Sequence, residues 1–361
     1  MSLGRKKVPF MNLPTPLEYL SNISRELGIN LYLKRDDLTG LGLGGNKLRK
    51  LEYFLYDAQQ QSATMLLTTG GLQTNHGRLT AAVAARYGLK CAIVVVDDNV
   101  DSTAEDTYAA IGPKPEASVE FTGNILLDTM MGADVIAYRK KADVSLTEQY
   151  DKAVAETKKY YEDLGEKVYV IPMGGSNELG MLGYYDCARE LTEQASSLGI
   201  SDSRVITAVG SMGTYMGLFC GLKYIGSPLS LTGIQIMPYE ESIRAYAKDY
   251  FDRVKKLYGF DFDADKSDFH IDDAYYYDGY NNPVEEVRES IYKMARKEAI
   301  ILDPCYTGKV FNAIRQMIID RKIQPGETVI MIHTGGQPGI YTPVHQAAME
   351  AELKDKVKII K

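Results

Sequence analysis

The strongest signal in this sequence is the segment Gly44-Gly45-Asn46-Lys47-Leu48-Arg49-Lys50-Leu51-Glu52, which follows a loop rich in Asp and Gly and opens a helical pattern. Asn46 is the expected N-cap, and Lys47 is the expected first residue of the helix. A cation is disfavoured at a helix N-terminus, and Arg49 and Lys50 add like charge, so the Lys47 amine should lose its proton readily. A neutral amine is what an imine-forming enzyme needs.

A plainer interpretation makes these three cations a solvated basic face on a surface helix. Three further segments argue against it, because each places small, hydroxyl or amide residues directly after a strand-like run. They are Thr69-Gly70-Gly71-Leu72-Gln73-Thr74-Asn75-His76, Val209-Gly210-Ser211-Met212-Gly213-Thr214 and Met331-Ile332-His333-Thr334-Gly335-Gly336.

Each of these segments suits one part of a ligand, and each could also be an ordinary turn. The segment ending at His76 suits a carboxylate or a hydroxylated ring held by backbone N–H groups. The segment ending at Thr214 has the glycines and hydroxyls to cradle a single phosphate at a helix N-terminus, although it is neither a Walker loop nor a GxGxxG fingerprint. Thr334, a hydroxyl beside two glycines, can meet a flat ring edge-on.

Continuously apolar, strand-like runs alternate with helical patterns along most of the chain. The expected strands are 29–34, 64–67, 91–96, 134–137, 168–171, 205–209, 231–236 and 328–333. The expected helices are 21–27, 47–61, 77–87, 123–131, 146–164, 214–224, 240–257, 284–299 and 309–320. This pattern predicts an α/β fold with two open, mostly parallel twisted sheets that carry helices on both faces. A ligand is then expected between the sheets, at the carboxyl ends of strands.

Composition and charge exclude several classes of partner. The chain has 361 residues, 45% of them hydrophobic and 25% charged, which suits about two globular domains. Its net charge of −7 leaves no basic stripe for a nucleic acid. No apolar run approaches the ~20 residues that span a bilayer, and residues 1–10 have no apolar signal core. We therefore expect a cytoplasmic protein with no nucleic-acid or membrane partner.

The cysteines and histidines form no recognisable metal or disulfide pattern. Four widely spaced cysteines in apolar contexts predict buried free thiols for at least three of them. Four histidines without a His-x-x-x-His spacing give a metal site little support, so no metal is predicted.

Eight motifs, in order along nearly the whole chain, closely resemble those of the family of D-cysteine desulfhydrases and 1-aminocyclopropane-1-carboxylate deaminases. They are Pro14-Thr15-Pro16-Leu17-Glu18, Lys34-Arg35-Asp36-Asp37, Gly44 to Glu52, Gln73 to His76, Gly174-Gly175-Ser176-Asn177, Gly210 to Thr214, Leu302-Asp303-Pro304-Cys305-Tyr306-Thr307-Gly308-Lys309 and His333 to Gly336. The family is tryptophan-synthase-β-like, depends on pyridoxal 5′-phosphate and has the fold known as type II. The Gly-Gly-Asn-Lys-x-Arg-Lys-Leu-Glu and Asp-Pro-x-Tyr-x-Gly-Lys motifs together are specific to this group.

The resemblance implies how the chain is divided and assembled. With a compositional break near residues 165–175, we expect a large cofactor-binding domain of residues 1–50 and 166–361 and a small domain of residues 51–165. A homodimer is expected from the family alone.

The resemblance also implies which residues bind the cofactor. Lys47 would be the Schiff-base lysine and the base that moves the substrate α-proton. Asn75 would hydrogen-bond the 3′-oxygen of the pyridoxal ring, and Thr334 would meet the ring nitrogen. The residues of the phosphate site would be Lys50, Gly210, Ser211, Met212, Gly213 and Thr214. A neutral threonine cannot hold the ring nitrogen protonated as an aspartate would, which favours expulsion of a Cβ leaving group over transamination.

The substrate side is implied in the same way. The loop of Thr74, Asn75 and His76 would receive the substrate carboxylate, while Tyr306 and Tyr280 would lie beside the substrate as further catalytic residues.

The resemblance favours an α,β-eliminating lyase of amino-acid metabolism that converts D-cysteine to pyruvate, hydrogen sulfide and ammonia. Thr307 follows Tyr306 and His76 follows Asn75, where the deaminases have Glu and Gln. Three alternatives stay open: a deaminase that opens aminocyclopropane carboxylate to 2-oxobutanoate, a lyase for another β-substituted amino acid such as D-serine, cysteate or chloroalanine, and a non-catalytic ligand-binding protein.

Overall fold

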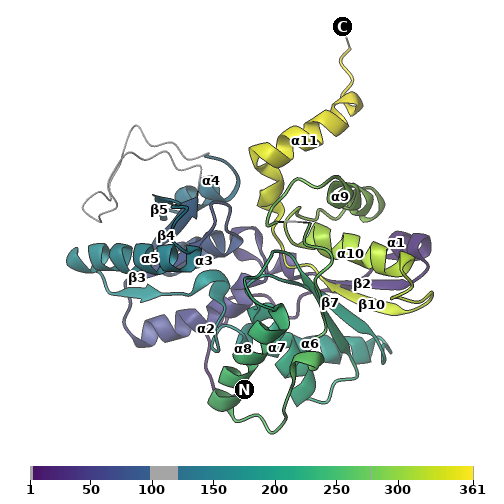
Figure 1. Ribbon diagram of the computed structural model, residues 1–361, viewed down its shortest axis with the longest axis horizontal. Helices are drawn as coiled ribbons and strands as arrows, with labels where there is room; N and C mark the ends of the chain where they lie inside the picture. The colour runs from purple at the N-terminus through teal and green to yellow at the C-terminus, as the bar shows by residue number, and fades with distance from the viewer. Residues whose placement is uncertain (1–2, 98–120, 278, 361) are drawn as a thin grey trace.

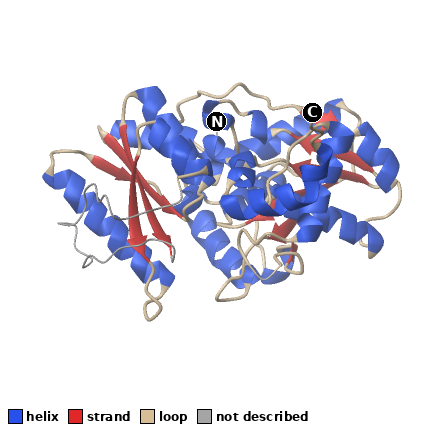
Figure 2. Ribbon diagram, turned by 90° about the horizontal axis from the view of Figure 1, so that it is seen from above, coloured by secondary structure: helices blue, strands red, loops and turns tan. Residues whose placement is uncertain are grey.

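The computed structural model describes residues 3–97, 121–277 and 279–360, and its strands form two sheets. The six-stranded sheet has the order β1 (Leu17–Tyr19), β2 (Asn30–Lys34), β10 (Thr328–Ile332), β7 (Arg204–Val209), β8 (Ser230–Gln235) and β9 (Ile271–Asp272). The four-stranded sheet has the order β5 (Asp134–Arg139), β4 (Lys90–Asp97), β3 (Met65–Gly70) and β6 (Val168–Val170). Figure 2 shows the two sheets as separate groups of red arrows among the blue helices.

The strands within both sheets run parallel, apart from β1, which pairs with β2 in the antiparallel direction. In the larger sheet Val329 of β10 pairs with Leu31 of β2, and in the smaller one Leu67 of β3 pairs with Ala92 of β4. Parallel pairing brings the carboxyl ends of neighbouring strands to one edge of each sheet. The glycine-rich segments predicted from the sequence leave the strands at these edges.

Eleven α-helices surround the sheets in the described part of the chain (Figure 1). Their bounds are α1 Ser21–Leu27, α2 Lys47–Gln60, α3 Asn75–Tyr87, α4 Gly123–Met130, α5 Leu146–Asp163, α6 Leu182–Ser197, α7 Gly213–Tyr224, α8 Ile243–Tyr258, α9 Glu285–Glu298, α10 Thr307–Ile319 and α11 Pro343–Leu353. None of these described helices is both long and apolar enough to cross a membrane.

Local sequence explains several helix ends. The side chain of Ser145 caps α5 and Glu148 bonds back to the Ser145 backbone, which satisfies two N–H groups that the helix leaves free. Helices α1 and α3 each end at a glycine in the left-handed conformation, Gly28 and Gly88.

Each sheet has a hydrophobic core on both faces. In β7, Val205 and Val209 belong to one core while Ile206 belongs to another, as alternation along a strand requires. In β4 the same alternation sends Ile93 to one core and Val94 to the other. Burial on both faces explains why these strands read as continuous apolar runs. The predicted fold class is confirmed.

Some elements were not predicted. Helices α6 and α11 and the short strands β1 and β9 were absent from the expectation. The predicted domain division stays a prediction, but β6 lies just beyond its boundary at residue 165 and pairs with β3 of the smaller sheet. The four cysteines are buried free thiols, as expected.

Candidate active site

Helix α2 begins at Lys47, as predicted, and its start is tied to two glycine-rich segments from the larger sheet. The Asn46 side chain makes no capping bond, contrary to expectation. Its Nδ2 instead donates to Thr214 Oγ1 at 3.0 Å, and its backbone N–H donates to the Thr334 carbonyl at 3.0 Å. These bonds bring Lys47 beside the ends of β7 and β10. Asn46 was expected only as a cap, and no local signal in the sequence points to this joining role.

The amines of Lys47 and Lys50 lie together, and neither has an acidic partner in the part of the chain that the structure describes. Burial lowers the pKa of Lys47 to about 8, although its interaction with Lys50 opposes the shift. Burial and then the charge of Lys47 hold the pKa of Lys50 well below its usual value. The Lys50 Nζ donates to the Gly174 carbonyl at 3.1 Å. The predicted direction for Lys47 is correct, but burial rather than the helix terminus is the main cause.

Arg49 projects from the same helix into a different environment. Its guanidinium donates to both carboxylate oxygens of Asp36 at 2.8 Å and to both of Glu190 at 2.9 Å. Burial opposes ionisation of Asp36, yet Arg49 outweighs it and lowers the pKa of that carboxyl. Arg49 and Lys50 are fully buried. The interpretation of these residues as a solvated surface face is therefore wrong.

A cup of small residues surrounds the Lys50 amine. A Cβ added to Gly213, at the start of α7, would lie 2.5 Å from Ser176 Oγ and 3.0 Å from Lys50 Nζ. Ser176 also accepts from the Gly213 N–H at 2.6 Å and donates to the Ser211 carbonyl. Gly174 lies close to Ser211 and would place a Cβ 3.6 Å from Lys47 Nζ. The sequence did not predict a role for Ser176, although it belongs to the motif Gly174-Gly175-Ser176-Asn177. Its position directly after two glycines was the only local indication of a ligand site.

The segment before α3 lies against this cup. A Cβ on Gly175 would lie 3.2 Å from His76 Cε1 and 3.4 Å from Lys50 Cδ. Burial, followed by the charges of Lys47 and Lys50, lowers the pKa of His76, so its ring is neutral. The Thr74 hydroxyl accepts from the Gly77 N–H at 3.2 Å and so caps α3.

Asn75 is oriented by two residues that the sequence did not single out. Asn124 Nδ2 donates to Asn75 Oδ1 at 3.0 Å, and Arg78 Nε donates to Asn124 Oδ1 at 2.9 Å. Arg78 also donates to the Gly44 carbonyl at 3.3 Å. The Asn124 bond holds the Asn75 side-chain oxygen and so fixes the orientation of its amide. Asn124 lies 49 positions away along the chain, so local sequence carries no signal for it.

Arg78 is buried beside a second unusual group, Asp128 of α4. Burial lowers the pKa of Arg78 to about 10, although the charge of Asp128 opposes the shift. Burial likewise raises the pKa of Asp128 to about 7, against the effect of Arg78. Neither carboxylate oxygen of Asp128 has a hydrogen-bond partner among the described residues.

The two predicted tyrosines meet each other. The hydroxyls of Tyr280 and Tyr306 are hydrogen-bonded, and their rings lie edge to face with centroids 5.7 Å apart. Tyr306 precedes α10, whose start is capped by Asp303 through the N–H groups of Cys305, Tyr306 and Thr307. A Cβ on Gly210 would lie 3.6 Å from Tyr306 Cε1, which places the pair next to the glycine cup. Burial raises the pKa of Tyr306 well above its usual value.

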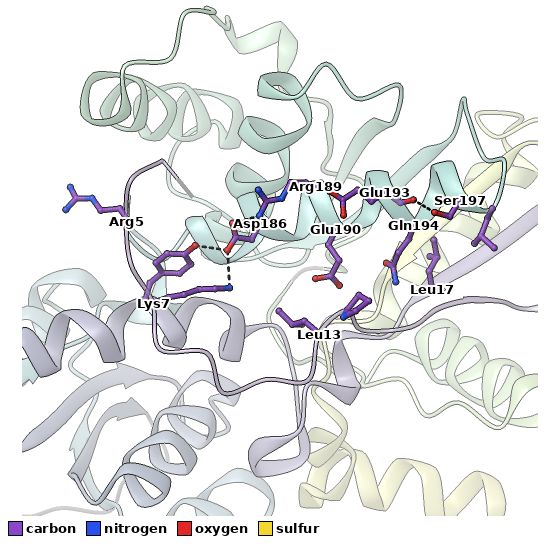
Figure 3. Close-up of a pocket in the computed structure, with 13 residues that line it drawn as sticks. Arg5, Lys7, Leu13, Leu17, Asp186, Arg189, Glu190, Glu193, Gln194 and Ser197 are labelled. Carbon is purple, nitrogen blue, oxygen red and sulfur yellow. Dashed lines mark hydrogen bonds and ion pairs between the residues drawn. The ribbon is translucent and has the colours of Figure 1, made fainter. Parts of the chain in front are cut away.

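A cavity of about 780 Å³ lies elsewhere, between the N-terminal segment and α6 (Figure 3). None of the predicted site residues line it. Glu190 and Gln194 do, and both accept hydrogen bonds from the buried Lys34 amine. The cavity therefore borders the ion network of Arg49 rather than the paired lysines.

Comparison with known proteins shows a consistent set of relatives. Residues 9–335 match the family model described as "Pyridoxal-phosphate dependent enzyme". The chain is 35% identical over 327 residues to a "Putative 1-aminocyclopropane-1-carboxylate deaminase" of Pyrococcus abyssi, covering 91% of this chain and 90% of that one. It is also 35% identical over 346 residues to a D-cysteine desulfhydrase of Yersinia enterocolitica, covering 94% and 98%. A crystal structure of an ACC deaminase homologue superposes with a TM-score of 0.79 at 32% identity, covering 98% and 95%.

Proposed function

The chain belongs to the family of pyridoxal-phosphate-dependent enzymes, and on that premise we propose that it is a lyase that removes the Cβ substituent of a small amino acid. The best-supported substrate is D-cysteine, which would yield pyruvate, hydrogen sulfide and ammonia. The observation that carries the proposal is the pair of buried amines, Lys47 and Lys50, which lie against a glycine cup and have no acidic partner among the described residues.

The residues present fit pyridoxal phosphate. Lys50 is fully buried, and the described residues supply it with no carboxylate, so a bound anion would stabilise its protonated form, which burial otherwise disfavours. No side chain fits at Gly213 beside the Lys50 amine. Backbone without a side chain is also what lets a phosphate approach the N–H groups at a helix start. We assign the phosphate to Lys50 with Gly210, Ser211, Met212, Gly213 and Thr214, the ring oxygen to Asn75 and the ring nitrogen to Thr334.

The division of labour in the reaction follows from this assignment. Pyridoxal phosphate, when bound, supplies an electron sink for the bond electrons released at the substrate α-carbon. Lys47 would hold the cofactor through its amine, and the same amine would accept the α-proton, for which a pKa of about 8 suits it at neutral pH. Thr74, Asn75 and His76 hold the substrate carboxylate, which keeps the α-proton directed at Lys47.

The tyrosines would act on the departing group. The Tyr306 phenol is protonated at neutral pH and can donate a proton to the sulfur as the Cβ–S bond breaks, although burial raises its pKa and so makes it a weaker acid. Tyr280, hydrogen-bonded to it, can share or replace that proton. Overall, one D-cysteine and one water give one pyruvate, one hydrogen sulfide and one ammonia.

Position 307 favours the desulfhydrase over the deaminase. The Thr307 hydroxyl donates to Asp303 Oδ1 at 2.6 Å and accepts from the Asp303 N–H at 2.8 Å, in a fully buried setting. The Thr307 side chain, next to Tyr306, therefore uses its hydroxyl in hydrogen bonds within the fold. The deaminases have a carboxylate at this position. The names of two relatives still support the deaminase as the second candidate.

The test starts from the purified protein loaded with pyridoxal phosphate and its visible absorbance. D-Cysteine, L-cysteine, 1-aminocyclopropane-1-carboxylate, D-serine and cysteate are then added separately, and sulfide, pyruvate and 2-oxobutanoate are measured. We expect sulfide and pyruvate in equal amounts from D-cysteine. Production of 2-oxobutanoate from the cyclopropane, without sulfide from D-cysteine, would instead establish the deaminase.

A cytoplasmic homodimer is part of the same proposal, on the strength of the family resemblance. Light scattering on the purified protein should give twice the chain mass of 40.2 kDa. A mass of one chain at micromolar concentration would contradict it.

A further inference from the structure

The segment that carries Tyr280 has an unfavourable backbone. It connects β9 to α9, and we call its described residues, 273–277 and 279–284, the tyrosine loop. Tyr277 and Asn281 have φ angles of +52° and +67°, in the left-handed region that non-glycine residues avoid. Each such residue costs on the order of 1 kcal/mol or more, and persists only where surrounding structure holds it.

Lys309 makes two hydrogen bonds to this loop, in addition to the one between His345 and Asn281. Its fully buried Nζ donates to the carbonyls of Tyr276 at 2.8 Å and Gly279 at 2.7 Å. A third bond, at 3.0 Å, goes to the carbonyl of Ile236, directly after β8. An ammonium group has three N–H donors, so these carbonyls satisfy it completely and join the loop to the sheet.

One helix therefore fixes both tyrosines. Tyr306 stands directly before α10, and Lys309 is the third residue of that helix. Asn312, three positions further and on the same face, donates from Nδ2 to the Tyr277 hydroxyl. The loop with Tyr280 thus rests on the face of the helix that begins at Tyr306.

We propose that Lys309 is a positioning residue that sets the Tyr280–Tyr306 pair, and with it the substrate-facing wall of the site, by holding the tyrosine loop on α10. This inference rests on the proposed function for the identity of the wall. The loop attachment itself can be tested without any substrate. Arginine cannot replace the lysine, because its planar fork does not converge on three carbonyls around one nitrogen.

The first test compares Lys309→Met with the wild type and with Lys256→Met, which removes an exposed lysine from α8. Each protein is loaded with pyridoxal phosphate and treated briefly with chymotrypsin, and cleavage after Tyr276, Tyr277 and Tyr280 is measured by mass spectrometry. Proteolysis of a segment tracks the population of its open form. We expect cleavage at these sites to rise about tenfold or more in Lys309→Met and to stay unchanged in the control.

The second readout is kinetic and counts only enzyme that carries cofactor. In Lys309→Met, kcat/KM for D-cysteine should fall about 10- to 100-fold, as expected when reacting groups are displaced by about 1 Å. The visible band and the cofactor Kd should match the wild type, because the hydrogen bonds of Lys309 among the described residues go to Ile236, Tyr276 and Gly279, none of which is assigned to the cofactor. Lys309→Arg should not restore the activity.

The outcomes separate this inference from the proposed function. Unchanged cleavage in a folded Lys309→Met protein, or a lost cofactor band, would overturn the role of Lys309. Wild-type protein that acts on no amino acid would refute the proposed function, while the cleavage comparison would still decide whether Lys309 holds the loop. If Lys309→Met does not fold, Tyr277→Phe is used instead, because it removes only the hydrogen bond between Asn312 and the loop. Cleavage of the loop should then rise by a smaller factor. Cleavage equal to that of the wild type would count against the attachment of the loop to α10.

Discussion

The two faces of helix α2 place their buried basic side chains in opposite electrostatic environments. Arg49 is surrounded by the carboxylates of Asp36 and Glu190, whereas Lys47 and Lys50 face a glycine cup with no acid among the described residues. All three lie within four consecutive positions. A buried cation with matched carboxylates holds a fold together, and a buried cation without them is prepared for an anion from outside. The contrast predicts different losses when each residue is removed.

Lys47→Ala should have the largest effect, which is a loss of the activity that depends on the Lys47 amine. With no amine to bind the cofactor or accept the α-proton, turnover of D-cysteine should fall by about 10³-fold or more, and the visible band should be lost or shifted. Absorbance and sulfide release measure both, and thermal unfolding of the cofactor-free protein should be unaffected. A variant that still supports the cellular role of the protein would point to the non-catalytic alternative.

Arg49→Met should give the largest change in stability. The substitution leaves the buried Asp36 carboxylate without its cation and Glu190 with Lys34 alone, at a cost of about 3–5 kcal/mol in the free energy of unfolding. Urea unfolding of the cofactor-free protein measures it. Arg49→Lys should recover only part of the loss, because an ammonium group cannot bond two carboxylates in parallel. A loss below 1 kcal/mol would show that the network is not structural.

Lys50→Met should change the free energy of unfolding in the opposite direction from Arg49→Met, or leave it unchanged. Removing a buried amine that lacks an acid should leave the cofactor-free protein as stable as the wild type or more so. Affinity for pyridoxal phosphate should fall about 10- to 100-fold, as expected for one hydrogen bond to a charged group. Fluorescence or absorbance titration with the cofactor, alongside urea unfolding, tests both signs. Destabilisation similar to that of Arg49→Met would remove the distinction between the faces.

The smallest expected effect is a displaced pH dependence. The pKa of Lys47 is about 8, below the ordinary 10.5, so half of the amine is neutral at pH 8 and nearly all of it well above that pH. At pH 7 about one amine in ten is neutral, compared with roughly one in three thousand for an ordinary lysine. The rate of cofactor uptake by the cofactor-free protein, followed by stopped-flow absorbance, should have its midpoint near pH 8. A midpoint near the ordinary lysine pKa would contradict the lowered pKa.

The sequence predicted most of the residues around Lys47 and Lys50 and few of those around Arg49. Lys47 at a helix start, the glycine segment up to Thr214 and the strand-end hydroxyl of Thr334 were recognisable because each is a short, local pattern. The structure brings these segments together through Asn46. The ligand roles assigned to them are still predictions.

The partners of Arg49 could not be read from local sequence. Asp36 is 13 positions away, and Glu190 is 141 positions away on α6, a helix that was not predicted at all. The same holds for Asn124 behind Asn75. Such pairs are selected by the packing of distant elements, which composition and periodicity do not encode. Local patterns identify groups that act on a ligand, and the groups that position them emerge only in three dimensions.

Helix α2 also connects the two sheets mechanically. Its first residues are bonded to the segment after β10, and a Cβ on Gly335 would lie only 2.8 Å from Gly45 Cα. Its later residues, including Leu51 and Phe54, pack in the core of the smaller sheet. Lys47 therefore lies at the joint between the two sheets, so a substitution in the core of either sheet can displace its amine without touching the site.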